Sequence, residues 1–245
     1  MLILLPPSET KRAGGTGRSL SLDTLRFPAL TEARRALADD LVALSADPDA
    51  AVVALKLGPT QRDEVDTNRT LWETPTLPAL DRYTGVLFDA LDAASLSAST
   101  RAFAGRHLAI HAALLGPVGA LDPIPAYRLS HDSRVPNRPL KRHWRGLIET
   151  SLALESGFVL DLRSEAYVAL GPAPEGSSFL RVLTEGAGGT RRALNHFNKK
   201  AKGEFTRAIL EAGTVFATAD DLLDWAPTAG FHLERHEGTE LALVV

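Results

Sequence analysis

The spacing of apolar residues along this chain predicts both strands and helices. Residues 1–5 form a short, continuous apolar run, which is typical of a buried strand, and Pro6 and Pro7 end it. Residues 31–44 repeat apolar side chains every three or four positions, as an amphipathic helix does. The same criteria predict strands at 107–111, 158–162 and 179–184 and a hairpin over 231–245. Further helices are predicted over 48–56, 61–71, 77–91, 141–154, 195–212 and 218–225.

The order of these elements favours one mixed α/β domain over the whole chain, 1–245. Strands and helices alternate without the strict rhythm of a purely parallel sheet. The segment 116–127 is rich in proline and glycine, so we predict a loop there. The sequence contains no internal repeat and no low-complexity tract that would divide it further.

Composition excludes several kinds of site. The chain has no cysteine, which rules out disulfides and thiolate metal ligands. Its seven histidines form no HExxH motif, so we expect no metal and no cofactor. No apolar run approaches the roughly 20 residues that span a bilayer, and the prolines after residue 5 cut short the apolar start that a signal peptide needs. We therefore expect a cytoplasmic protein without membrane contacts.

The distribution of charge points to an anionic partner although the net charge is −3. Three stretches that are almost free of acidic residues, 11–18, 134–145 and 191–207, hold 14 of the 27 lysines and arginines. A chain polarised in this way can present a positive face on an acidic body. The alternative for any single run is an ordinary solvated face.

Two glycine-containing segments are candidates for phosphate contacts. A helix on either side of Leu57-Gly58-Pro59 predicts a possible helix-hairpin-helix element at about 48–71, in which backbone N–H groups and Arg62 would face a phosphate. Many helical hairpins have glycine in the turn and bind nothing. The runs 14–17 and 187–189 are glycine-rich, but they match neither a Walker A nor a dinucleotide fingerprint, which favours a structural role.

Three other segments carry residue types that suit chemistry on a charged ligand. Ser8, Glu9 and Lys11 follow the first strand, where α/β proteins place functional groups, although an ordinary proline-rich turn is equally compatible. In the segment 122–129, two prolines restrict the backbone and thereby fix the direction of the Tyr127 and Arg128 side chains. A tyrosine can stack on a base and an arginine can hold a phosphate, whereas a buried Asp122–Arg128 pair would only hold the loop.

The third segment is the basic helix start at 197–207. Lys199, Lys202 and Lys200 are predicted to cover one face of this helix. Gly203 lies in its middle, at a cost of about 1 kcal/mol relative to alanine, and it would allow a neighbouring backbone or a ligand to come close.

These segments resemble the motifs of the YaaA family, in order and over nearly the whole chain. The matching segments are LPPSETK at 5–11, YTG at 83–85, LLGPVGALDPIPAYRL at 114–129, Trp144, DLRSEAY at 161–167, FNKKAKGEFTR at 197–207 and GF at 230–231. The chain departs from the family pattern in two of them. The family's tyrosine, arginine and proline in the third motif are Leu115, Gly119 and Ala120 here, and its asparagine and alanine in the fifth are Asp161 and Arg163.

The resemblance implies a single compact YaaA-type fold with a central mixed sheet, surrounding helices and a positively charged cleft. It also implies a helix-hairpin-helix-like element, binding to duplex or distorted DNA, and a part in surviving peroxide stress by limiting free iron. No segment of the sequence indicates iron ligation.

Two functions of different classes follow, and a purely structural role for all the motifs is a third. The first is a DNA-binding stress protein whose contacts are largely independent of base sequence. Its predicted DNA contacts are Gly58, Arg62, Arg138, Lys141, Arg142, Arg145, Lys199, Lys200, Lys202 and Arg207. The second is an enzyme acting on a nucleotide, nucleobase or related anion. Its candidate residues are Ser8, Glu9, Lys11, Tyr127, Arg128, Ser164, Glu165 and Lys199. Convergence of these loops on one site would favour the enzyme, and an open basic groove would favour the DNA-binding protein.

Overall fold

A computed structural model describes residues 1–185, 191–192 and 195–245 of the chain. The main sheet has seven strands in the order β4-β3-β1-β6-β7-β10-β9, and β8 pairs with β7 beside this path. Its strands are β1 (Leu2–Leu5), β3 (Leu108–Ala112), β4 (Gly116–Gly119), β6 (Val159–Asp161), β7 (Ser178–Glu185), β8 (Arg191–Arg192), β9 (His232–Arg235) and β10 (Leu241–Val244). A separate pair consists of β2 (Leu77–Pro78) and β5 (Pro123–Ile124).

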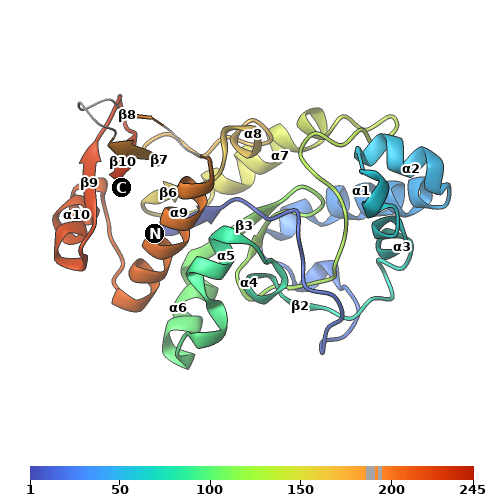
Figure 1. Cartoon of the computed structure of the whole chain (residues 1–245), viewed down its shortest axis with the longest axis horizontal. Helices are drawn as coiled ribbons and strands as arrows, with labels where there is room; N and C mark the ends of the chain where they lie inside the picture. Colours follow the sequence, from blue (N-terminus) through green and yellow to red (C-terminus); the bar gives the residue numbers. More distant parts are fainter. Residues whose placement is uncertain (186–190, 193–194) are drawn as a thin grey trace.

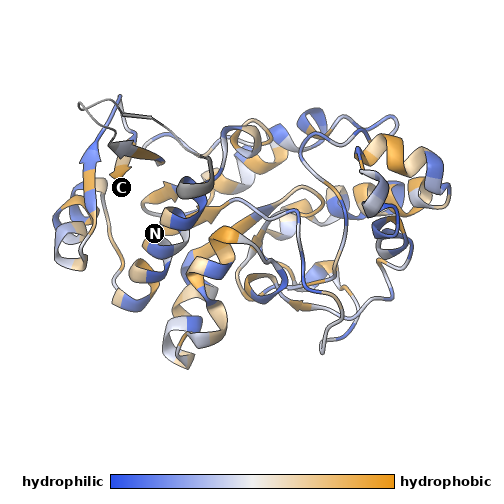
Figure 2. Ribbon diagram, viewed as in Figure 1, coloured by the Kyte–Doolittle hydropathy of each residue, from blue (hydrophilic) through white to orange (hydrophobic). Residues whose placement is uncertain are grey.

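The strand β1 is an interior strand of the sheet, and its four residues are all apolar and buried. It runs parallel to β3 on one side and to β6 on the other. The strands β7 and β10 continue the parallel set, while β4 and β9 are antiparallel edge strands. Parallel strands are covered on both faces, which is why their sequences read as continuous apolar runs. Figure 2 shows this hydrophobic centre between more polar helices.

Helices surround the sheet, as Figure 1 shows, with α2 and α3 at one end of the molecule and α10 at the other. Their bounds are α1 (Thr31–Ser45), α2 (Pro48–Leu55), α3 (Glu64–Arg69), α4 (Ala79–Arg82), α5 (Val86–Leu91), α6 (Ala98–His107), α7 (Leu140–Ala153), α8 (Glu165–Val168), α9 (Asn195–Ala212) and α10 (Ala219–Trp225). The mixed α/β class with a central sheet is therefore confirmed. The strand at 1–5, the strand near 179–184 and the C-terminal hairpin are confirmed as well.

The prediction that 77–91 is mostly helical is confirmed in part. The chain forms β2, α4 and α5, and the two helices are separated by a turn at Gly85, whose φ of +96° lies in the region that favours glycine. The segment 116–127 is not all loop, because β4 pairs with β3 along the sheet edge and β5 pairs with β2. A glycine- and proline-rich sequence can form edge strands, where some ladder hydrogen bonds are not needed.

Candidate ligand site at the carboxyl ends of the central strands

The segment that leaves the carboxyl end of β1, residues 6–11, begins the candidate site. The chain passes from β1 to β3 on one side and later returns to β6 on the other side. In open α/β sheets, ligands bind outside the carboxyl ends of strands where the strand order reverses in this way. The topology alone therefore selects the loop after β1 and the loop after β6.

Lys11 is the central group of this site. Its Nζ donates hydrogen bonds to the carbonyl oxygens of Ser8 (3.1 Å) and Glu9 (3.2 Å). The same nitrogen lies 4.3 Å from the ring centroid of Tyr127 and 5.4 Å from that of Tyr83. Burial lowers the pKa of Lys11 to about 8, against the opposing effect of the Glu9 carboxylate. A substantial fraction of this amine is therefore neutral near pH 8.

Two of the chain's three tyrosines, Tyr83 and Tyr127, lie against this lysine, and the third, Tyr167, interacts electrostatically with both of them. The hydroxyls of Tyr83 and Tyr127 share a hydrogen bond of 2.8 Å. Tyr167, from α8, lies edge-on to the rings of His111 and His131, each with centroids 5.5 Å away. Burial raises the pKa of all three tyrosines, so their phenols stay protonated and act as hydrogen-bond donors.

Arg128 joins the site to α3. Its Nη1 lies 3.2 Å from a carboxylate oxygen of Glu64 and 3.6 Å from one of Glu9. The other Glu9 oxygen accepts a 2.8 Å hydrogen bond from Ser130. The alternative of a buried Asp122–Arg128 pair is wrong, because Asp122 accepts hydrogen bonds from two backbone amides instead.

A second, fully buried network lies at the end of β6. The side chain of Arg163 donates two hydrogen bonds to Asp161, from Nη2 at 2.6 Å and from Nε at 2.8 Å. Its Nη1 donates to the carbonyl oxygen of Gly171. Its Nη1 also lies 2.8 Å from Nδ1 of His111. Because a guanidinium only donates, His111 must accept at Nδ1, and it is the neutral tautomer with the proton on Nε2. Burial and the Arg163 charge lower the pKa of His111, in agreement with that assignment.

Lys202 of α9 reaches the same edge. Its Nζ donates to the carbonyl oxygens of Leu162 (2.8 Å) and Arg163 (3.4 Å), and burial lowers its pKa to about 8. The side chain therefore faces the sheet, not a solvated basic face as the helix periodicity predicts.

Of the predicted catalytic candidates, five come together and three do not join them. Ser8, Glu9, Lys11, Tyr127 and Arg128 are linked by the contacts above and by a 3.2 Å contact between the Ser8 and Thr10 hydroxyls. The remaining three lie at the margin. Ser164 precedes α8, Glu165 is largely exposed and pairs with Arg181 at 3.0 Å, and Lys199 is exposed.

Sequence reasoning missed Tyr83, Tyr167, Glu64, Asn68 and His131. The available signal was the small number of tyrosines, each of them within a family motif. Glu64 and Asn68 carry no such signal, because only the packing of α3 brings them to the site.

The predicted DNA-contacting residues fall into two groups. Six of them already have partners within the protein. The amide of Gly58 donates to Gln61, Arg62 pairs with Asp49, Arg138 with Asp40, Lys200 with Glu204 and Arg207 with Glu211, and Lys202 binds the carbonyls described above.

The other four, Lys141, Arg142, Arg145 and Lys199, are exposed, and their side chains have no hydrogen bond or ion pair to any residue that the structure describes. The two helices of the predicted helix-hairpin-helix element do form, as α2 and α3, but they lie at the end of the molecule away from α9 (Figure 1). DNA binding by this element stays a prediction.

The glycine-rich run at 14–17 has a packing role. A Cβ atom at Gly15 would lie 2.6 Å from the carbonyl oxygens of Pro75 and Thr76, so only glycine fits there. Arg82 is buried beneath and donates to the carbonyl of Gly14 at 2.7 Å. The other glycine-rich candidate, 187–189, lies outside the described residues.

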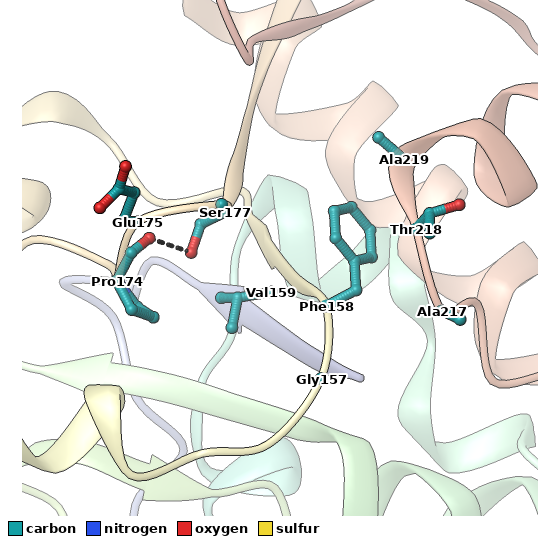
Figure 3. A pocket seen from close by; sticks show the side chains of 10 residues that line it. Gly157, Phe158, Val159, Pro174, Glu175, Ser177, Ala217, Thr218 and Ala219 are labelled. Carbon is teal, nitrogen blue, oxygen red and sulfur yellow. Dashed lines mark hydrogen bonds between the residues drawn. The ribbon is translucent and has the colours of Figure 1, made fainter.

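A cavity of about 360 Å³ lies at the opposite edge of the sheet, at the amino ends of β6 and β7. Figure 3 shows Phe158 between the segment 174–177 and the segment 217–219, with Ser177 donating a hydrogen bond to the carbonyl of Pro174. Glu175 is its one charged lining residue among those described. The cavity therefore lacks the paired acids, bases and donors found at the carboxyl edge, and we assign it no chemistry.

Two classes of feature are not found among the described residues. They contain no cluster of three or more His, Asp or Glu side chains that could hold a metal ion. No helix within the described ranges is long and apolar enough to cross a membrane.

Comparison with known proteins decides the family. The sequence profile of the family described as peroxide stress protein YaaA matches residues 1–237. The chain belongs to the YaaA family. UPF0246 proteins of Corynebacterium glutamicum (strain R) and Corynebacterium efficiens are 41% and 42% identical to it, and both matches cover all of each chain. A UPF0246 protein of Streptomyces coelicolor is 40% identical over 96% of this chain and 92% of its own length. The two corynebacterial matches therefore extend over the whole of this YaaA-family chain.

Proposed function

We propose that this protein acts in the response to peroxide stress in the cytoplasm, by binding and transforming a nucleotide, nucleobase or related small anion at the carboxyl ends of β1, β3 and β6. Family membership supports the link to peroxide. One observation supports the site: the half-buried Lys11 lies against the rings of Tyr83 and Tyr127 at the point where the strand order reverses.

The residues of this site suit proton transfer on a bound anion. Lys11 has a pKa of about 8, so it can take up or release a proton near neutral pH. The tyrosines supply neutral donors, and Arg128 supplies a permanent positive charge. A surface that only binds DNA phosphates needs none of these buried groups, because phosphate contacts are made from exposed lysines and arginines.

Survival of cells in hydrogen peroxide tests the importance of the site. A strain whose own copy of the gene is deleted would carry the wild type, Lys11→Met, or the surface variant Lys141→Ala/Arg142→Ala/Arg145→Ala. We expect Lys11→Met to fail to restore survival, although circular dichroism shows it folded, and the surface variant to restore it. The reverse pattern would refute the proposal.

Ligand binding by the purified protein is the second part of the test. Adenosine monophosphate and adenine serve as probes for the two ligand classes, and the melting temperature is followed with increasing probe. We expect at least one probe to stabilise the wild type and not Lys11→Met, since a ligand stabilises only the state that binds it. If neither adenosine monophosphate nor adenine raises the melting temperature of the wild type, the proposal is contradicted for these two ligand classes.

DNA binding is the second candidate function, and the four exposed cations without described partners favour it. Three of them, Lys141, Arg142 and Arg145, lie in the first two turns of α7. Each phosphate contact steepens the loss of affinity with salt. If this surface binds DNA, affinity for a short duplex should fall steeply between about 50 and 200 mM salt, and less steeply in the triple alanine variant. An affinity insensitive to salt would exclude it.

A further inference from the structure

Two hydrogen bonds from the side chain of Asn68 hold the main chain at Arg128. The side-chain amide of Asn68 donates to the carbonyl oxygen of Arg128 at 2.9 Å and accepts from its backbone N–H at 2.7 Å. Asn68 itself is fully buried. This two-way clamp, made from α3, fixes the point from which the arginine side chain starts.

The Nη1 group of the Arg128 guanidinium contacts acidic residues of the protein. Its Nη1 lies toward Glu64 and Glu9, at 3.2 and 3.6 Å. Its Nε is buried and has no hydrogen-bond partner among the described residues, and the ion-pair contacts of the guanidinium with those residues come from Nη1. Only 11% of the side chain is exposed. A buried donor without an acceptor is costly, so such an atom calls for an explanation.

The Nε–H and one N–H of Nη2 point the same way and form a fork. This edge matches the two oxygens of a carboxylate or phosphoryl group, which it binds with two parallel hydrogen bonds. We propose that this edge of Arg128 receives an oxyanion of the ligand, and that Asn68 is the positioning residue that aims it. The inference rests on the proposed function and names an oxyanion as the part of the ligand that Arg128 binds.

The two carboxylates beside Arg128 should oppose the incoming anion. The side chains of Glu9 and Glu64 are 46% and 39% exposed, so either can turn toward water. Glu64→Gln removes one negative charge without changing shape. It should therefore bind the anion more tightly than the wild type, while Arg128→Lys keeps the charge, loses the fork and binds more weakly.

Nuclear magnetic resonance of the arginine Nε–H groups reports on this edge directly. The Arg128 signal is assigned as the one missing from Arg128→Lys. Wild-type protein would be titrated with inorganic phosphate, adenosine monophosphate, succinate and a short DNA duplex. We expect the Arg128 signal to move with phosphate and adenosine monophosphate if the oxyanion is phosphoryl, and with succinate if it is a carboxylate. The affinity for the active probe should fall about tenfold or more in Arg128→Lys, the ratio that one charge-assisted hydrogen bond supplies.

Matched variants separate a specific fork from general charge. Arg181→Lys is the control, because the Nε of that arginine already donates to Glu240, and it should leave affinity unchanged. Asn68→Ala should weaken binding while leaving the chain folded, and Glu64→Gln should strengthen it. If no probe moves the Arg128 signal, or if Arg128→Lys binds as the wild type does, the inference is overturned.

The outcomes also distinguish the inference from the proposed function. Adenosine monophosphate that binds equally to wild type and Arg128→Lys would leave the small-molecule site standing and remove Arg128 from it. A signal that moves with the duplex alone would support the fork and overturn the small-molecule function in favour of DNA.

Discussion

Replacing Gly203 with alanine should destabilise the protein although alanine is the better helix former. Gly203 lies in the middle of α9, where that helix packs against α5. A Cβ atom added there would lie 2.2 Å from the carbonyl oxygen of Leu87 and 2.8 Å from the Cβ of Ala90. Neither atom belongs to a flexible side chain, so α9 would have to move away from α5.

The expected size follows from two opposing effects. Overpacking a core costs typically about 1–3 kcal/mol, and a collision with backbone belongs at the upper end. The better helix propensity of alanine returns about 1 kcal/mol. The net loss should be about 2 kcal/mol, which lowers the melting temperature of a chain of this size by about 4–8 °C.

Gly146 provides the matched control. It lies in α7, is exposed, and a Cβ atom added there would meet nothing within 4 Å. Gly146→Ala should therefore stabilise the protein by about 1 kcal/mol. Urea unfolding followed by circular dichroism measures both changes. If Gly203→Ala proves as stable as Gly146→Ala, the close approach of the two helices is refuted.

Three further predictions concern buried groups of the candidate site. Burial lowers the pKa of Lys11 from 10.5 to about 8, so between these values the unfolded chain binds more protons and stability rises with pH. The unfolding free energy of the wild type minus that of Lys11→Met should therefore grow between about pH 8 and 10 in urea titrations, and a constant difference would disprove the shift. Tyr127→Phe and Tyr83→Phe should each cost about 1–3 kcal/mol by leaving one buried hydroxyl without its partner, and the double variant should cost less than their sum, whereas additive costs would mean no coupling. Asp161→Asn should cost about 3–5 kcal/mol because the Arg163 charge stays buried. Adding Arg163→Ala to Asp161→Asn should restore part of the lost unfolding free energy, which urea unfolding measures. If the double variant is less stable still, the buried charge is not the cause of the loss.

The apolar pattern of the sequence predicts the main elements of the fold because burial follows hydrophobicity over short distances. The run at 1–5 has no polar position, which is typical of a strand covered on both faces. The basic, amphipathic pattern at 195–212 predicts α9. The glycine in its middle predicts the close approach of either a neighbouring backbone or a ligand, and the neighbour is α5. The same reasoning was only partly right at 77–91, because residues 77–78 form β2 and Gly85, whose φ is +96°, lies in the turn between α4 and α5.

Which side chains meet in space was decided by the tertiary structure alone. Lys11, Tyr83, Tyr127 and Tyr167 are separated by up to 156 positions in sequence. The bridge between Lys11 and Tyr83, the pairing of β2 with β5 and the parallel pairing of β1 with β6 bring their segments together. Charge counts predict basic surfaces, but they cannot say that Lys202 turns inward to carbonyls or that Arg207 pairs with Glu211. Local sequence encodes hydrophobicity and backbone preference, whereas the partner of a charged group depends on strand order and helix packing, which are properties of the whole chain.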